Sequence, residues 1–268
     1  MNIGMITATY YMRIYDYKRP EPFQWGDMED KYRQEFKKDD FLELVKEIKS
    51  VGFNSLEIWA PMYSFEVYTP DDAKDMAVEL NNLGFSSLAY CIGGWRKKDI
   101  PRIEKAYAFA KAMGCKVVTG CIQKDDAQVI LDEVERCGIK YGLLYAIENH
   151  PEPSIEKPED VDRLTKPYKT VGANLDTGIY NKMGYDVLKA ADLLKEKVYH
   201  IHLKDSPKGG NGCLPLGDSD TPIAELLKKF KEWDYQYMVS IEYEYPTDPK
   251  PGLYKSMGFI NGVLACIK

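Results

Sequence analysis

Acidic and imidazole side chains gather at the ends of four short apolar segments in the second half of the chain. The segments read "YAIENH", "ANLDTG", "YHIHLKD" and "SIEYEY". Carboxylates and imidazoles are costly to bury unpaired in apolar surroundings, and a shared divalent cation removes that cost. A set rich in oxygen with a little nitrogen suits Mn²⁺, Mg²⁺, Co²⁺ or Fe²⁺ better than a thiolate-based zinc site. The candidate groups are Glu148, His150, Asp176, His200, His202, Glu242 and Glu244.

Two of the three histidines in the chain, His200 and His202, lie one residue apart in "VYHIHLKDSP". Alternate residues of a strand point to the same face, so both rings share a face, with His200 one layer deeper. Lys204 shares that parity. We expect its ammonium group either to reach a substrate oxygen or to balance the carboxylates.

A repeated unit of helix, glycine and strand positions these groups. The helical stretches end at Gly52, Gly84, Gly114 and Gly138, and a short apolar run follows each glycine. A glycine just past the end of a helix adopts the left-handed backbone without a Cβ clash. Four such junctions in a row are typical of successive βα units.

The apolar runs predict eight strands alternating with helices. One of these helices carries Phe41, Leu44, Val45 and Ile48 at helical spacing. This pattern predicts a single-domain (β/α)₈ TIM barrel over residues 1–268, in which the carboxyl ends of the strands meet at one rim. The alternative, an open doubly wound sheet, would show a glycine-rich phosphate loop after the first strand, and none is present. The expected strands are 2–8, 54–59, 86–92, 115–121, 142–148, 172–176, 198–203 and 237–243.

A long aromatic connection, residues 10–37, follows the first strand. Because it follows a strand, it belongs to the barrel face that carries active sites. Long connections on that face often serve as lids or specificity elements. We therefore expect an active-site lid, with a subunit contact through the aromatic residues as the alternative.

Composition narrows the partners. The net charge is −6 and no long basic run is present, so we expect no nucleic-acid partner. No apolar stretch is long enough to cross a membrane, and the first residues do not resemble a signal peptide. The six cysteines form no CxxC pair, which is typical of free thiols in a reducing compartment. We expect a cytoplasmic protein with no membrane partner.

The motifs "ENH", "LDTG", "HIHLKDS" with the following "PLGDSD", and "SIEYE" closely resemble the xylose isomerase-like barrel superfamily. Its members include sugar isomerases, ketose 3-epimerases, inosose dehydratases and repair enzymes of the endonuclease IV type. The resemblance covers essentially the whole chain and is strongest over residues 141–245. The repair enzymes hold several metal ions with many histidines, and a chain with three histidines does not fit that class.

The resemblance implies that Glu148, Asp176, His202 and Glu242 bind one divalent ion. Mn²⁺ is the first candidate, and Mg²⁺, Co²⁺, Fe²⁺ and Zn²⁺ are alternatives. We expect supporting roles for His200, beneath the site, and for Asp205, which would orient a neighbour. The expected substrate contacts are Glu57, Trp59, His150 and Lys204.

The implied activity is isomerisation or epimerisation of a sugar or polyol. Glu148 and Glu242 would move a proton on and off a carbon next to a carbonyl through a metal-bound enediolate. Ile179 stands where the 3-epimerases commonly carry a histidine, and Lys204 and Lys208 stand where an arginine is usual, so a strict 3-epimerase assignment is weakened. The alternatives are a metal-dependent lyase or dehydratase acting on a keto-sugar and a non-catalytic sugar-binding or partner subunit. The family also leads us to expect a homodimer or homotetramer.

Overall fold

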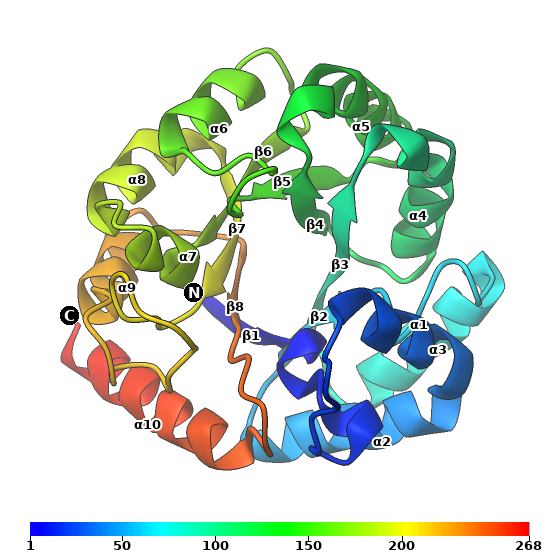
Figure 1. The fold of residues 1–268 in the computed structure, drawn as a ribbon, viewed down its shortest axis with the longest axis horizontal. Helices are drawn as coiled ribbons and strands as arrows, with labels where there is room; N and C mark the ends of the chain where they lie inside the picture. The colour runs from blue at the N-terminus through cyan, green and yellow to red at the C-terminus, as the bar shows by residue number, and fades with distance from the viewer. Residues whose placement is uncertain (268) are drawn as a thin grey trace.

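Eight parallel strands close into a barrel in the computed structural model, which describes residues 1–267. The strands follow one another around the ring in chain order, and the last pairs with the first. Helices surround the ring, so each strand is covered on its outer side (Figure 1). The strands are β1 (Asn2–Ile6), β2 (Ser55–Trp59), β3 (Ser87–Trp95), β4 (Val117–Ile122), β5 (Leu144–Glu148), β6 (Val171–Asp176), β7 (Val198–Leu203) and β8 (Met238–Ile241).

Ten α-helices are present in the described residues, with short 3₁₀ turns between some of them. Two strands, β1 and β6, are each followed by two helices, and each of the other six is followed by one. The helices are α1 (Trp25–Glu35), α2 (Lys38–Val51), α3 (Pro70–Asn82), α4 (Ile100–Ala112), α5 (Ala127–Tyr141), α6 (Pro158–Thr165), α7 (Thr177–Lys182), α8 (Val187–Leu194), α9 (Ile223–Glu232) and α10 (Lys250–Cys266).

The predicted single-domain TIM barrel is confirmed, and all eight predicted strands are present. The apolar stripe of α2, formed by Phe41, Leu44, Val45 and Ile48, is fully buried, as its helical spacing predicts. Strand β3 runs to Trp95, three residues beyond the predicted end, and its pairing with β4 shifts register on the way. That shift carries the end of β3 further over the rim.

One predicted helix end is wrong. Gly52, Gly84 and Gly114 have φ values of 114°, 82° and 80°, as helix-ending glycines should. Gly138 instead lies inside α5, and the helix ends at Gly142, with φ of 64°. Gly138 serves close packing, since a Cβ there would lie 2.2 Å from Oγ1 of Thr170.

Residues 10–37 begin at the last residue of one 3₁₀ turn (Thr7–Tyr10) and contain a second (Arg13–Tyr15) and helix α1. Tyr32 of α1 is fully buried, and its hydroxyl donates to the backbone oxygen of Tyr10 at 2.9 Å. This contact anchors α1 to the end of β1 and so to the rim of the barrel. No helix in residues 1–267 has the length and hydropathy of a membrane span.

Candidate metal centre and active site

Four side chains from four consecutive strand ends meet at the carboxyl rim of the barrel. Each of Glu148, Asp176, His202 and Glu242 offers a donor atom, and these atoms lie within 4.8 Å of one another. Nδ1 of His202 is 3.3 Å from Oε1 of Glu148 and 3.1 Å from Oε2 of Glu242. Asp176 and His202 are cross-strand partners on β6 and β7, while Glu148 ends β5 and Glu242 follows β8. The closed barrel therefore brings together residues spread over 95 positions of sequence.

Three donor atoms of this cluster have no hydrogen-bond partner among the described residues. They are Oδ2 of Asp176, Nδ1 of His202 and Oε2 of Glu242, and all three are buried. Buried polar atoms are almost always partnered, so three unpartnered atoms directed at one point need a common partner. One hard divalent cation satisfies them all, and three carboxylates with one imidazole are a donor set that such ions accept. The residues fit the predicted ion.

Lys204 supplies the nearest positive side chain. Its Nζ lies 2.6 Å from Glu244, 3.4 Å from Glu242 and 3.8 Å from Asp176. Burial opposes charge on Glu242, but the positive charges of Lys204 and His202 outweigh burial and lower the pKa of Glu242. Burial raises the pKa of Asp176 well above its usual value, against the opposing charge of Lys204. The cluster thus holds more negative charge than Lys204 balances alone.

A second layer of polar groups lies directly beneath the cluster. Oε2 of Glu57, on β2, lies 3.0 Å from Nε2 of His202 and 2.8 Å from Nε2 of His200. Oε1 of the same carboxylate accepts a hydrogen bond from the hydroxyl of Thr119. Nε2 of His200 also lies 3.0 Å from the hydroxyl oxygen of Ser240. Glu57 therefore crosses the barrel interior and ties β2 to β4 and β7.

This arrangement assigns the two ring nitrogens of His202. A carboxylate can only accept, so a His202 that binds an ion would keep its proton on Nε2, toward Glu57, and would offer Nδ1, which lies toward Glu148 and Glu242. A carboxylate behind a histidine is the usual way in which proteins fix the tautomer and orientation of a metal ligand. Burial opposes charge on Glu57, while the charges of His200 and His202 outweigh it and lower its pKa well below the usual range.

Backbone contacts within the motifs hold the strand ends at fixed positions. The side chain of Asn149 accepts from the backbone N–H of Asp176 at 2.9 Å and donates to its carbonyl at 3.2 Å. The hydroxyl of Thr177 accepts from the backbone N–H of Lys204 at 2.9 Å and donates to its carbonyl at 2.7 Å. Asp205 accepts the backbone N–H groups of residues 217–219, which orders the loop after β7.

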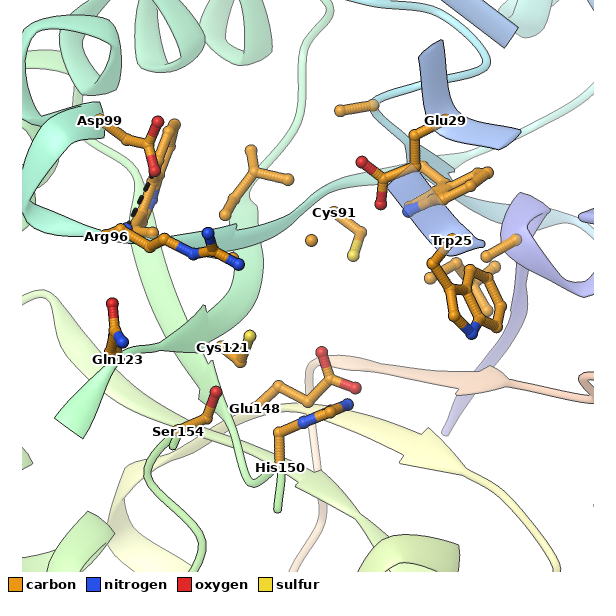
Figure 2. Close-up of a pocket in the computed structure, with 18 of the residues that line it drawn as sticks. Trp25, Glu29, Cys91, Arg96, Asp99, Cys121, Gln123, Glu148, His150 and Ser154 are labelled. Carbon is orange, nitrogen blue, oxygen red and sulfur yellow. Dashed lines mark hydrogen bonds between the residues drawn. The ribbon is translucent and has the colours of Figure 1, made fainter. Parts of the chain in front are cut away.

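A pocket of about 680 Å³ opens above the cluster. Glu148, His202 and Glu242 form part of its floor, and His150 lies beside Glu148 at its edge (Figure 2). Trp59, at the end of β2, also lines it. Of the candidate residues named from the sequence, these five and Glu244 border the pocket directly.

The other predicted site residues lie away from the pocket lining. Glu57 and His200 are fully buried beneath His202, and Glu57 has no surface facing the pocket, in contrast to the expected substrate contact. Lys204 is 7% exposed and is surrounded by carboxylates, the second of the two arrangements expected from its parity. Asp176 and Asp205 are fully buried.

Several residues of the pocket wall were missed by the sequence reasoning. Helix α1 contributes Trp25, Glu29 and Arg33, and the segment after β3 contributes Arg96 and Lys98. Figure 2 labels Trp25, Glu29 and Arg96. Their elements could be predicted, since residues 10–37 were expected at this rim. The sequence could not predict which residues of these elements line the pocket, because no spacing rule tells which loop side chains point inward.

The comparisons with known proteins agree with the barrel fold. A family profile described as "Xylose isomerase-like TIM barrel" matches residues 45–262. A structure of an L-ribulose 3-epimerase has a TM-score of 0.76 at 14% identity, covering 100% of this chain and 96% of the other. A D-tagatose 3-epimerase-like protein gives 0.74 at 17%, with coverages of 100% and 98%.

A 3-keto-D-glucoside 4-epimerase from E. coli gives a TM-score of 0.70 at 17% identity, covering 98% of this chain and 99% of the other. No curated protein sequence matches the chain. At these identities the structural likeness establishes the barrel architecture. The chemistry has to be argued from the site itself.

Proposed function

The chain belongs to the xylose isomerase-like TIM barrel family, and on this premise we propose that it is a divalent-metal-dependent isomerase or epimerase of a sugar or polyol. One observation carries the proposal. Two glutamates from strands that are not neighbours, Glu148 after β5 and Glu242 after β8, approach the same nitrogen of His202 and also border the pocket. The structures of similar shape include two described as sugar epimerases.

The residues of the cluster would have two roles, metal binding and proton transfer. Glu148, Asp176, His202 and Glu242 would hold the ion, which when bound polarises a substrate carbonyl and makes the neighbouring C–H more acidic. One of the two glutamates removes a proton from that carbon, and the other returns a proton to it. Because the two glutamates come from strand ends that are not adjacent, each could face a different side of a bound substrate, which epimerisation requires.

The surroundings support proton transfer without loss of intermediates. Trp59 and the β3 and β4 strand ends wall off the pocket from the side, and α1 extends along its mouth. His150 lies next to Glu148, where its ring can bind a substrate hydroxyl (Figure 2). A pocket walled in this way limits the access of bulk water to the reacting carbon.

Deuterium incorporation tests the proposal. The protein is loaded with Mn²⁺ and incubated with a panel of ketoses, inososes and keto-glucosides in D₂O, and the products are analysed by mass spectrometry. We expect deuterium to enter at the carbon next to the carbonyl without loss of water. Loss of water or of an aglycone would instead identify the protein as a lyase or dehydratase acting on a keto-sugar. No exchange with any member, together with no thermal stabilisation by Mn²⁺ or Co²⁺, would leave a non-catalytic binding protein.

Two amide variants test the roles of the glutamates. Glu148→Gln and Glu242→Gln should each slow exchange by roughly 10²–10⁴-fold, because each removes one proton-transfer group. Glu232→Gln, at an exposed position on α9, is the matched control and should exchange like the parent protein. Retained exchange in either active-site variant would refute the role of that glutamate. Bound Mn²⁺ is measured in each variant, so that loss of the ion is recognised.

A further inference from the structure

Two exposed cationic side chains of the pocket wall form no ion pair with an acid among the described residues. Four arginine and lysine side chains line the pocket, and they come from α1, from the segment after β3 and from α4. They differ sharply in their partners. The four are Arg33, Arg96, Lys98 and Arg102.

Two of these four side chains each form ion pairs with at least two acidic residues. Arg33 lies 3.1 Å from Glu29 and 3.4 Å from Glu66. Arg102 lies 2.8 Å from Glu66 and 2.7 Å from Asp99. Glu66 thereby links α1 to α4 across the mouth of the pocket. These arginines hold the wall together and have little capacity left for a ligand.

Arg96 and Lys98 form no ion pair within residues 1–267. The acid nearest to Arg96 in sequence, Asp99, is already used: Oδ2 accepts the backbone N–H of Arg96 at 3.1 Å, and Oδ1 accepts from Arg102. Figure 2 shows the guanidinium of Arg96 extending into the pocket from the β3 side, facing Glu29 and Trp25 across it. Glu29 is itself held by Arg33. Arg96 is thus an exposed guanidinium that points into the pocket and has no ion-pair partner among the described residues.

The remaining acids of the pocket have cationic partners of their own. Glu148 and Glu242 lie against His202, Glu244 lies against Lys204, and Glu152 lies 3.8 Å from Lys124. The pocket therefore presents two different ends. A carboxylate-rich floor takes a cation, and a wall after β3 carries free positive charge.

We propose that Arg96, with Lys98, forms a subsite for an anionic group of the substrate, so that the substrate is a keto-sugar bearing a phosphate or a carboxylate away from the carbon that reacts. This deepens the proposed function and rests on it. A guanidinium binds either oxyanion through two parallel hydrogen bonds, and such charge-assisted pairs are the strong ones. A pocket of about 680 Å³ is in the range that takes ligands of drug size, which leaves room for a substituent beyond the sugar.

Equilibrium binding tests the subsite without requiring turnover. Titration calorimetry with the Mn²⁺-loaded protein compares D-fructose, D-fructose 6-phosphate and D-fructuronate at low ionic strength. We expect at least one of the two anionic sugars to bind roughly 10-fold or more tightly than fructose. The phosphate and carboxylate arms show which anion the subsite takes.

Arg96→Gln should remove that preference and leave the affinity for fructose unchanged. Lys97→Gln is the matched control, since it removes a neighbouring charge that does not line the pocket, and it should keep the preference. The proposal would be overturned if fructose and both anionic sugars bound equally, or if none of them bound. It would also be overturned if Arg96→Gln kept the same preference for the anionic sugar as the parent. Preferential binding of an anionic sugar without deuterium exchange in the panel would sustain the subsite and count against the isomerase assignment. Deuterium exchange in the panel without any preference for an anionic sugar would sustain the isomerase assignment and count against the subsite.

Discussion

The two halves of the barrel rim are built in different ways. The half formed by β5–β8 carries buried side chains at the strand ends, held by neighbouring backbone and by a carboxylate from below. The half formed by β1–β4 carries side chains from connections and from α1, several of them exposed, such as Trp25 at 44%. We infer that the β5–β8 half performs the chemistry and that the β1–β4 half selects the substrate.

The difference follows from what each task requires. A metal centre tolerates little movement of its donors, so strands, whose backbone is fixed on both sides, are the natural support. Substrate selection needs variety of shape and charge, which loops at this face of a TIM barrel supply. The exception is Glu57, which starts on β2 and acts across the barrel on His202. It joins the two halves.

The largest expected effect is loss of metal binding in Asp176→Asn. The carboxylate has two separate partners, since Oδ1 accepts the N–H of Ile179 at the start of α7 while Oδ2 is the unpartnered atom of the cluster. Asparagine keeps the helix cap and removes the charged donor. We expect stability without metal to stay near that of the parent. The stabilisation by Mn²⁺, about 2.7 kcal/mol at 100 times the Kd, should disappear. Thermal unfolding with and without Mn²⁺ measures both.

Asp176→Ala is the companion variant. It removes the cap as well as the donor, so it should also lower the stability of the metal-free protein by about 1 kcal/mol. If Asp176→Asn retains the full Mn²⁺ stabilisation, the site in the β5–β8 half is assigned wrongly. In that case the β5–β8 half cannot be assigned the chemistry, and the proposed division of tasks between the two halves is wrong.

A smaller effect on the same centre is expected from Glu57→Gln. The amide can still accept one hydrogen bond, but it no longer supplies the charge that holds the proton on Nε2 of His202. We expect Mn²⁺ affinity to fall by roughly 10–100-fold. Thr119→Val, which removes only the neutral partner of the same carboxylate, should change it less. Unchanged affinity in Glu57→Gln, measured by calorimetry, would mean that Glu57 supports the fold and not the ligand.

The same division explains what the sequence could predict. The meeting of polar side chains at one rim could be predicted because four polar motifs follow apolar strands, and a barrel brings the strand ends together. The choice of four of them as metal ligands came from the resemblance to the family and stays a prediction. The buried stripe of α2 could be predicted because its apolar residues recur at helical spacing, which is also a local pattern. The partners of Glu57 were not, because His200 and His202 meet it across 143 and 145 positions of chain, and no local pattern records that approach. Gly138 was misplaced because the close packing on Thr170 is also a tertiary contact.

Changes in the β1–β4 half should alter substrate binding and spare the metal. Trp25 stacks on Tyr11 at 4.9 Å between ring centroids and lines the pocket mouth. We expect Trp25→Ala to raise the KM of a substrate found in the exchange panel by roughly 3–10-fold, with unchanged Mn²⁺ affinity. Tyr254→Ala, at an exposed aromatic residue on α10, is the control. Weaker Mn²⁺ binding in Trp25→Ala would show that the halves are coupled.

The smallest effect is expected outside the rim, on the outer surface behind β3 and β4. Hydrogen bonds from Lys140 and Arg136 on α5 lower the pKa of Glu104 on α4 to about 2. Because the folded-state pKa is depressed, the contribution of Glu104 to stability is present above its ordinary pKa near 4.5 and is lost as the pH falls toward 2. Glu104→Gln should therefore lower the melting temperature slightly at pH 7 and less at pH 3, because the network is solvent-exposed and screened. Metal affinity and KM should stay unchanged. A change in either would mean that the pocket wall after β3 is held by the packing of α4 on α5, and that substrate selection in this half depends on the helices as well as on the loops.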